Sequence, residues 1–297
     1  MNISTEWLLL AYSVAIALLS LAGGLLPSWI RMTHTRTQLV MSFVSGLMLG
    51  VAFYHLLPHS LALQPEGRGA DSSVWWLMIG LIVMLLLLRM FHFHQHDFSD
   101  VGHRQQVHAA VHDHDHDHDH GHPHAHNHAP AAAHRFSWVG LALGLGLHTL
   151  IDGVALGAVL QGEAGHAAGP AGVGVFLAIL LHKPLDAMSI TTIMEAGGWS
   201  ARSRTCANLG FALMCPLGAM LFYFGVDLLG DARHYAVAVA LAFAAGTFIC
   251  IALSDLLPEV HFHSHDRGKL TLVFLAGIVL AYAIGAVEPG NAHLPLH

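Results

Sequence analysis

Long apolar runs separated by short polar segments make up most of this chain of 297 residues. Eight runs approach the roughly 20 residues that an α-helix needs to cross a bilayer. They cover residues 7–30, 38–61, 74–91, 137–160, 171–194, 205–229, 234–257 and 270–287. The first run is too long for the core of a signal peptide, so we interpret it as a retained helix. The pattern predicts an all-α membrane protein, a single transmembrane domain over residues 1–297 with eight transmembrane helices.

The composition agrees, because 55% of the residues are apolar and only 10% are charged. Such values are typical of membrane proteins and exclude an ordinary soluble domain. The three cysteines all fall in predicted helices and form no CxxC pair, so they indicate no disulfide framework or redox site. No nucleophile–base set is apparent, so we do not expect an enzyme.

Lysine and arginine predict the orientation, because they are enriched in cytosolic loops. With the N-terminus outside, nine of the twelve basic residues fall on the cytosolic side and two fall outside. The cytosolic set is Arg31, Arg36, Arg89, Arg104, Arg135, Arg202, Arg204, Arg267 and Lys269; the outer set is Arg68 and Arg233. This bias puts both termini outside. An odd number of helices would remove it, so it supports the count of eight independently of hydropathy.

A histidine-rich segment, residues 92–135, joins the third and fourth predicted helices and holds 15 of the 27 histidines. Its polar, repetitive composition cannot bury a core, so we expect a disordered cytosolic loop. Imidazole titrates near neutral pH and binds zinc well, and alternating aspartates add oxygen ligands. We therefore expect metal binding in this loop. The first candidate ligands are His112, His114, His116, His118 and His120.

An internal repeat relates the second and seventh predicted helices. FVSGLMLGVAFYHLLP begins at Phe43 and FAAGTFICIALSDLLP begins at Phe243, with six identical positions at an offset of 200 residues. The two helices should cross the membrane in opposite directions, so the repeat is inverted, which is typical of secondary transporters. It predicts a 3+2+3 arrangement in which the fourth and fifth helices form the central pair.

The central pair carries two matching motifs. HTLIDG puts His148 four residues before Asp152 in the fourth helix. HKPLDA does the same with His182 and Asp186 in the fifth. Four residues are about one helical turn, so each pair lies on one helix face near mid-membrane, where ionisable groups are costly and usually functional. We expect the pairs to form one cage for a divalent cation, although each histidine could instead simply bond its own aspartate.

Lys183 lies inside the second motif. A buried ammonium could pair with Asp152 or Asp186, could lose its proton, or could offset the negative charge of an empty site. Its depth in the helix argues against a side chain that extends to the membrane surface.

Polar residues also flank the prolines of the repeat. His55 and His59 lie on either side of Pro58 near the outer end of the second helix. Asp255 and Glu259 occupy the matching positions near the inner end of the seventh helix. We interpret them as ligands at the outer and inner mouths of an ion path, with interfacial polar capping as the alternative.

At these motifs the chain resembles the ZIP (Zrt/Irt-like) metal transporters. The resemblance implies eight helices, termini outside, and movement of zinc, or sometimes iron, manganese or cadmium, toward the cytosol. It assigns His148, Asp152, His182 and Asp186 to the transport site. Some members look binuclear; the corresponding places here hold Thr149, Lys183 and Cys215. Because a cation replaces one expected ligand, we expect one metal.

We therefore expect a multi-pass protein of the cell membrane that imports zinc, with no cofactor. Its expected partners are the metal ion and the lipid bilayer, without nucleic acid. Small-residue faces such as 140–148 could pack within one protomer or across a homodimer. One alternative is an exporter of the cation diffusion facilitator type, which also pairs two such motifs. Another is a membrane-anchored metal sensor or buffer that works through the histidine-rich loop.

Overall fold

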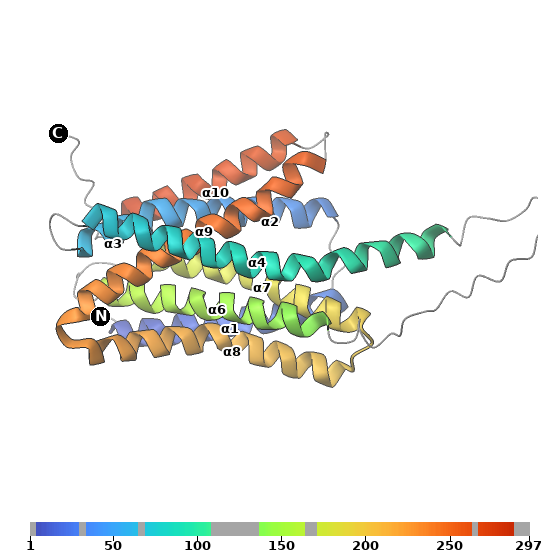
Figure 1. The fold of residues 1–297 in the computed structure, drawn as a ribbon, viewed down its shortest axis with the longest axis horizontal. Helices are drawn as coiled ribbons and strands as arrows, with labels where there is room; N and C mark the ends of the chain where they lie inside the picture. Colours follow the sequence, from blue (N-terminus) through green and yellow to red (C-terminus); the bar gives the residue numbers. More distant parts are fainter. Residues whose placement is uncertain are drawn as a thin grey trace, which may run out of the picture.

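The computed structural model describes residues 4–29, 34–64, 69–107, 137–163, 171–262 and 267–287. Within these ranges every regular element is helical and none is a strand, which confirms the predicted class (Figure 1). The helices are α1 (Thr5–Trp29), α2 (His34–Val51), η1 (Ala52–Leu56), α3 (Leu57–Leu63), α4 (Gly69–Val107), α6 (Ser137–Gly162), α7 (Val173–Ala196), α8 (Ala201–Gly225), η2 (Val226–Ala232), α9 (Arg233–Phe262) and α10 (Arg267–Val287).

By length and apolar composition, seven helical segments in the described ranges are able to cross a membrane. One of them runs for 54 residues, from Ala201 to Ser254, and contains α8, η2 and α9 as far as Ser254. These two helices are joined by η2, in which Gly230 has the non-helical angles φ 53° and ψ −121°. The chain reverses direction there, so α8 and α9 run antiparallel through the molecule (Figure 1).

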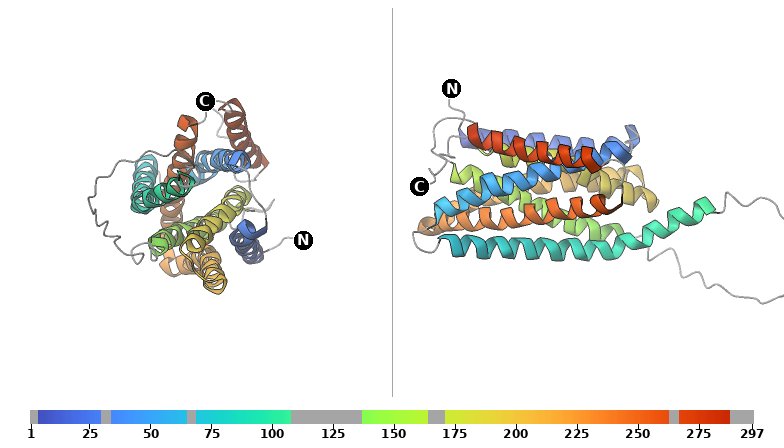
Figure 2. Two further views of the ribbon diagram at one scale, coloured as in Figure 1. Left: turned by 90° about the vertical axis from the view of Figure 1, so that its right-hand side faces the viewer. Right: turned by 90° about the horizontal axis from the view of Figure 1, so that it is seen from above.

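The long helices form two groups that lie against each other. In one group α6 packs along α8, and α1 packs along both α7 and α8. In the other, α2 packs along α10 and α9, and α4 packs along α9. The end-on view in Figure 2 shows the two groups with α6 and α7 at the side that faces α2, α4 and α9. The pairs of motifs on α6 and α7 therefore lie close to the boundary between the groups.

Glycines allow close helix approach at matching places in the second group. A methyl group on Gly46 of α2 would overlap the Phe274 carbonyl oxygen of α10. A methyl group on Gly246 of α9 would overlap the Leu77 carbonyl oxygen of α4 in the same way. Gly46 and Gly246 are equivalent positions of the sequence repeat, so both copies use the same glycine to pack against a neighbouring helix.

Two helix boundaries differ from the sequence-based prediction. The run 38–61 is not one regular helix, because Ala52–Leu56 forms a π-helical turn between α2 and α3. The backbone of α4 continues to Val107, beyond residue 92, where the predicted loop begins. Apolar composition marks the part of a helix that suits lipid, but a helix satisfies its own backbone and can extend into water. Residues 108–136 lie outside the described residues.

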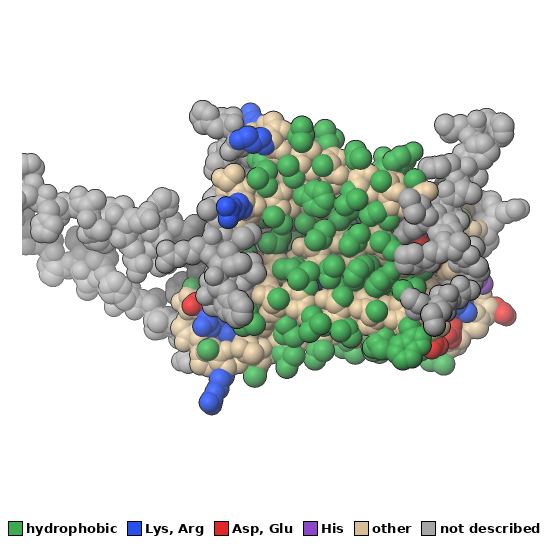
Figure 3. All heavy atoms as spheres, turned by 180° about the vertical axis from the view of Figure 1, so that it is seen from behind, with side chains coloured by type: hydrophobic (Ala, Val, Ile, Leu, Met, Phe, Trp, Pro, Cys, Tyr) green, Lys and Arg blue, Asp and Glu red, His purple; other side chains and the backbone are tan. Residues whose placement is uncertain are grey.

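Apolar side chains form a broad belt across the face shown in Figure 3, and most Lys and Arg side chains on that face lie at one end of the belt. Arg36, Arg202 and Arg267 all lie in the first turns of helices that begin at the end where α4 finishes and α6 starts. Arg233 begins α9 at the other end. Such a belt has the character of a surface in contact with lipid, with its basic residues sorted to one side.

Candidate metal centre

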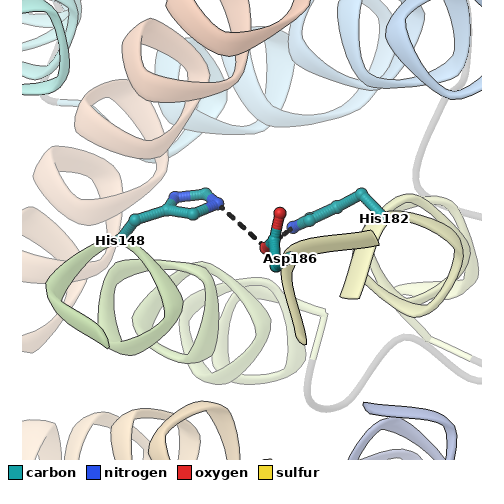
Figure 4. Close-up of side chains that lie close together, drawn as sticks. All are labelled: His148, His182 and Asp186. Carbon is teal, nitrogen blue, oxygen red and sulfur yellow. Dashed lines mark ion pairs between the residues drawn. The ribbon is translucent and has the colours of Figure 1, made fainter. Parts of the chain in front are cut away.

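The predicted motifs on α6 and α7 meet near the middle of the bundle. His148 and Asp152 share one face of α6, and His182 and Asp186 share one face of α7, as the four-residue spacing predicts. Figure 4 shows His148 reaching from α6 toward Asp186, with the His182 ring on the other side of that carboxylate. The two imidazole rings lie 5.5 Å apart, centroid to centroid. Four candidate ligands from two antiparallel helices thus surround one small space.

The separations between these groups match the demands of a tetrahedral metal. His148 Nε2 lies 3.3 Å from Asp152 Oδ2 and 3.7 Å from Asp186 Oδ2. His182 Nε2 lies 3.2 Å and 3.8 Å from the same two oxygens. Bonds of about 2.1 Å at a tetrahedral angle put ligand atoms about 3.4 Å apart. All four nitrogen–oxygen distances fall close to this value, and the ligand atoms of His148, His182 and Asp186 all lie within 4.8 Å of one another.

Local hydrogen bonding points the His182 ring into the cage. Its Nδ1 donates to the Ala178 carbonyl oxygen at 2.8 Å, one turn earlier in α7. In a neutral ring Nε2 then carries the lone pair that binds a metal, whereas in a protonated ring it donates to Asp152 Oδ2 at 3.2 Å. Metal-binding histidines are usually held by such a bond from the second ring nitrogen. His148 Nδ1 and Asp152 Oδ1 are buried without a hydrogen-bond partner among the described residues.

Lys183 is fully buried and pairs with both aspartates. Its Nζ lies 2.5 Å from Asp152 Oδ2 and 2.9 Å from Asp186 Oδ2. It also donates to Thr149 Oγ1 at 3.2 Å, and the Thr149 hydroxyl in turn donates to the Leu145 carbonyl oxygen. The three acceptors use all three protons of the ammonium. Of the roles considered from the sequence, this geometry favours a charged lysine that bridges the carboxylates.

Burial separates the two aspartates. Asp152 has no exposed surface, whereas the Asp186 side chain is 19% exposed. His148, His182 and Lys183 are buried. Two carboxylates and one ammonium leave a net charge of minus one when both imidazoles are neutral. The cage is therefore attractive to a dication, and Asp186 is its most accessible oxygen ligand.

Two glycines beside the cage, one on each helix, allow α8 to lie close to α6. A methyl group on Gly153, which follows Asp152, would overlap the Cys215 carbonyl oxygen of α8. A methyl group on Gly218 would overlap the Leu150 carbonyl oxygen of α6. The centroid of the Phe211 ring of α8 lies 5.8 Å from Lys183 Nζ. Lys183 is thereby enclosed on the α8 side of the cage.

The histidines predicted at the outer mouth lie together but apart from the cage. His55 Nε2 donates to the Ala281 carbonyl oxygen of α10 at 2.9 Å, and His59 Nδ1 donates to the His55 carbonyl oxygen at 2.8 Å. His59 Nε2 faces Glu163 Oε1 at 3.5 Å. Glu163, at the end of α6, was not anticipated. Its only signal in the sequence is an acidic residue three positions after the apolar run 137–160.

The remaining candidate ligands are not placed. Asp255 and Glu259 belong to the backbone of α9, but their side chains lie outside the described residues. The loop histidines also lie outside them. That set is His112, His114, His116, His118 and His120.

Comparison with known proteins identifies the family. The family model for the ZIP zinc transporter matches residues 7–285, which include every helix of the core. The chain belongs to the ZIP zinc transporter family. The resemblance inferred from the motifs is confirmed, and this ZIP protein is an integral, multi-pass membrane protein of a metal-transporting family.

Similar proteins carry the same family name. Zinc transporter ZIP9-B of Xenopus laevis is 28% identical over 332 aligned residues, which cover 94% of this chain and 98% of that protein. Zinc transporter ZIP9 of Micropogonias undulatus is 33% identical, over 50% of this chain and 51% of that protein. Zinc transporter ZIP1 of Homo sapiens is 30% identical, over 46% of this chain and 40% of that protein. These relatives do not favour the exporter alternative.

Proposed function

We propose that this ZIP protein carries zinc across a cell membrane into the cytosol, through the cage formed by α6 and α7. The observation that carries the proposal is the arrangement of the four predicted ligands. Each of the two imidazole nitrogens lies 3.2–3.8 Å from both carboxylate oxygens, in the middle of an apolar bundle. Such a donor set suits zinc and also accepts iron, manganese or cadmium.

The proposed topology has eight crossings in a 3+2+3 arrangement with an inverted repeat. The reversal at η2 supports counting α8 and α9 as separate crossings. Reciprocal glycine contacts support the repeat. Gly277 of α10 packs against the Phe43 carbonyl oxygen, and Gly80 of α4 packs against the Phe243 carbonyl oxygen. Phe43 and Phe243 are equivalent repeat positions, so the third helix of each half packs against the second helix of the other half.

The proposed orientation puts both termini outside. The helix ends that carry Arg36, Arg202 and Arg267 lie at the end from which α4 leads into the histidine-rich segment. Basic residues concentrate on the cytosolic side of membrane proteins, so this end should face the cytosol. Zinc would then move from the end that carries His55 and His59, through the cage, toward Asp255 and Glu259 and the histidine-rich segment.

In the proposed mechanism the cage holds one metal, and Lys183 takes part in the cycle. Without metal, its ammonium compensates the two buried carboxylates, which would otherwise repel each other in a low-dielectric site. When zinc binds, the ammonium and the dication repel each other while sharing the same oxygens. This repulsion weakens metal binding. A transport site benefits from it, because an ion held too tightly is not released.

Cytosolic zinc in zinc-starved cells tests the proposed direction. Cells that express the wild-type protein should gain cytosolic zinc when the metal is added outside, because the cage delivers it inward. Cells with His148→Ala, which removes one ligand, should stay near the untransfected level at equal surface expression. A fall in cytosolic zinc with increased zinc tolerance would instead support the exporter reading.

A further inference from the structure

A histidine and a carboxylate outside the cage repeat the local arrangement found within it. In the cage, His182 donates its Nδ1 proton to the carbonyl four residues earlier and faces Asp152 with Nε2. At the outer end, His59 donates its Nδ1 proton to the His55 carbonyl, also four residues earlier, and faces Glu163 with Nε2. In both places a helical carbonyl fixes the ring and turns one nitrogen lone pair toward a carboxylate.

One carboxylate lies in α6, and the other belongs to the residue that directly follows this helix. Asp152 and Glu163 are eleven residues apart, and the Glu163 backbone still donates to the Val159 carbonyl oxygen as in a helix. Eleven residues are about three turns, so the two acids lie on one face of α6, about 16 Å apart along its axis. His59 and Glu163, the outer pair, thus lie in line with the cage, toward the mouth where zinc is proposed to enter.

Glu163 also caps α7, but this role uses only one of its oxygens. Oε2 accepts a hydrogen bond at 2.9 Å from the backbone N–H of Gly172, the residue before α7. Oε1 is the atom that faces His59. Glu163 is 8% exposed and the His59 side chain 13%, so both are largely withdrawn from water. Capping explains a carboxylate at this place, but it does not explain a histidine ring held with its Nε2 toward the second oxygen.

We propose that His59 Nε2 and Glu163 Oε1 bind a divalent cation of the zinc class at the outer end of α6, as a capture site that precedes the cage. Their separation of 3.5 Å is close to the roughly 3.4 Å expected for two ligands of one tetrahedral zinc. His55 is a positioning residue, because its carbonyl oxygen orients the His59 ring and its own ring anchors η1 to α10. Two protein ligands, with water completing the shell, suit brief capture. The inference rests on the proposed inward transport.

Zinc anomalous scattering from crystals of the full chain tests binding. We expect one peak between His59 Nε2 and Glu163 Oε1 and a separate peak in the cage. Glu163→Gln should remove only the outer peak, and Asp152→Asn only the cage peak. A cage peak without an outer peak in the wild-type protein overturns this inference and leaves the proposed function standing. An outer peak without a cage peak contradicts the proposed function instead. A wild-type protein with no outer peak, even at saturating zinc, means that His59 and Glu163 form a protonated ion pair only.

Zinc uptake as a function of external zinc tests the capture role. Glu163→Gln keeps an oxygen that can accept from Gly172, so the cap survives while the charge is lost. We expect its KM to rise about tenfold, as for other weakened metal sites, with an unchanged maximal rate. His59→Gln has no part in the cap and should give the same result, which excludes a folding defect as the cause. Glu195→Gln is the matched control, since Glu195 pairs with Arg204 at the other end of the bundle. Wild-type KM values in both outer variants would overturn the capture role.

Discussion

The Lys183 ammonium of α7 lies 2.5 Å from an oxygen of Asp152 on α6, and neither side chain reaches solvent. This contact joins the two central helices through opposite charges at the middle of the bundle. It explains how a bundle with two carboxylates at its centre can be stable before a metal arrives, because the lysine supplies positive charge inside the cage. The Lys183 ammonium therefore already compensates part of the negative charge of the cage.

Substitution of Lys183 should destabilise the metal-free protein and increase its dependence on zinc. In Lys183→Met the stem is kept but the ammonium is lost, and breaking a buried pair in this way costs about 3–5 kcal/mol. We expect a lower Tm without metal and a larger rise in Tm on adding zinc than in the wild-type protein. Thermal unfolding of the purified protein measures both. Arg202→Met, at an exposed position, should behave as wild type. A metal-free Tm equal to that of the wild type would contradict the charge-compensating role.

The cage should hold one zinc ion. Lys183 Nζ already uses Asp152, Asp186 and Thr149 as acceptors, and its charge repels a second dication at that side. We expect a single anomalous peak in the cage at saturating zinc. Two strong peaks there would contradict the assignment of Lys183. Lys183→Glu replaces the repulsive charge with a ligand, and the second peak should appear in that variant only.

Much of this arrangement follows from the sequence, because few backbone structures can satisfy all of their own hydrogen bonds in lipid. Apolar runs must form helices, and a four-residue spacing must put His148 and Asp152 on one helix face. The partners of Lys183 could not be chosen from the sequence, because Asp152 and Asp186 were equally available and only the packing of α6 against α7 brings both oxygens to one ammonium. The helical extension of α4 was missed for a related reason, since hydropathy marks contact with lipid and not the end of a helix.

The two repeat glycines should be equally intolerant of a side chain. Gly46→Ala and Gly246→Ala each push a methyl group against the backbone of a neighbouring helix, and such overpacking costs about 1–3 kcal/mol. We expect a lower Tm in both variants, by similar amounts. Gly210→Ala is the control, because nothing lies within 4 Å of an added methyl group there. In that variant the Tm should be unchanged or slightly raised, since alanine favours helix. A clear difference between Gly46→Ala and Gly246→Ala would contradict equivalent packing.

Deletion of residues 112–128 separates a transporter from a buffer. The cage on α6 and α7 does not include this tract, so initial zinc uptake should stay within about twofold of wild type, although regulation by cytosolic zinc should change. Uptake of labelled zinc at matched surface expression measures the first effect. A loss of uptake as complete as in His148→Ala would support the reading in which the histidine-rich tract is the working part.

The contact between His59 and Glu163 could not be predicted from the sequence. His59 stood out because it flanks a proline in the repeat, but Glu163 follows an apolar run and resembles an ordinary helix end. Only the folded chain brings His59 of α3 to 3.5 Å from Glu163. The π-helical turn η1 separates α3 from α2. A π-helical turn leaves no clear mark in a pattern of apolar residues, yet it changes which side chains of α3 face α6.

Zinc uptake into proteoliposomes that contain only this protein tests the central claim most directly. The wild-type protein should accumulate zinc down its gradient, and Asp152→Asn, which removes the carboxylate shared by both imidazoles and Lys183, should reduce the rate at least about a hundredfold. Thr205→Val, at an exposed hydroxyl that donates to the Ala201 carbonyl oxygen of the same helix, should transport as wild type. Uptake by Asp152→Asn at the wild-type rate, in correctly folded protein, would contradict transport through the cage.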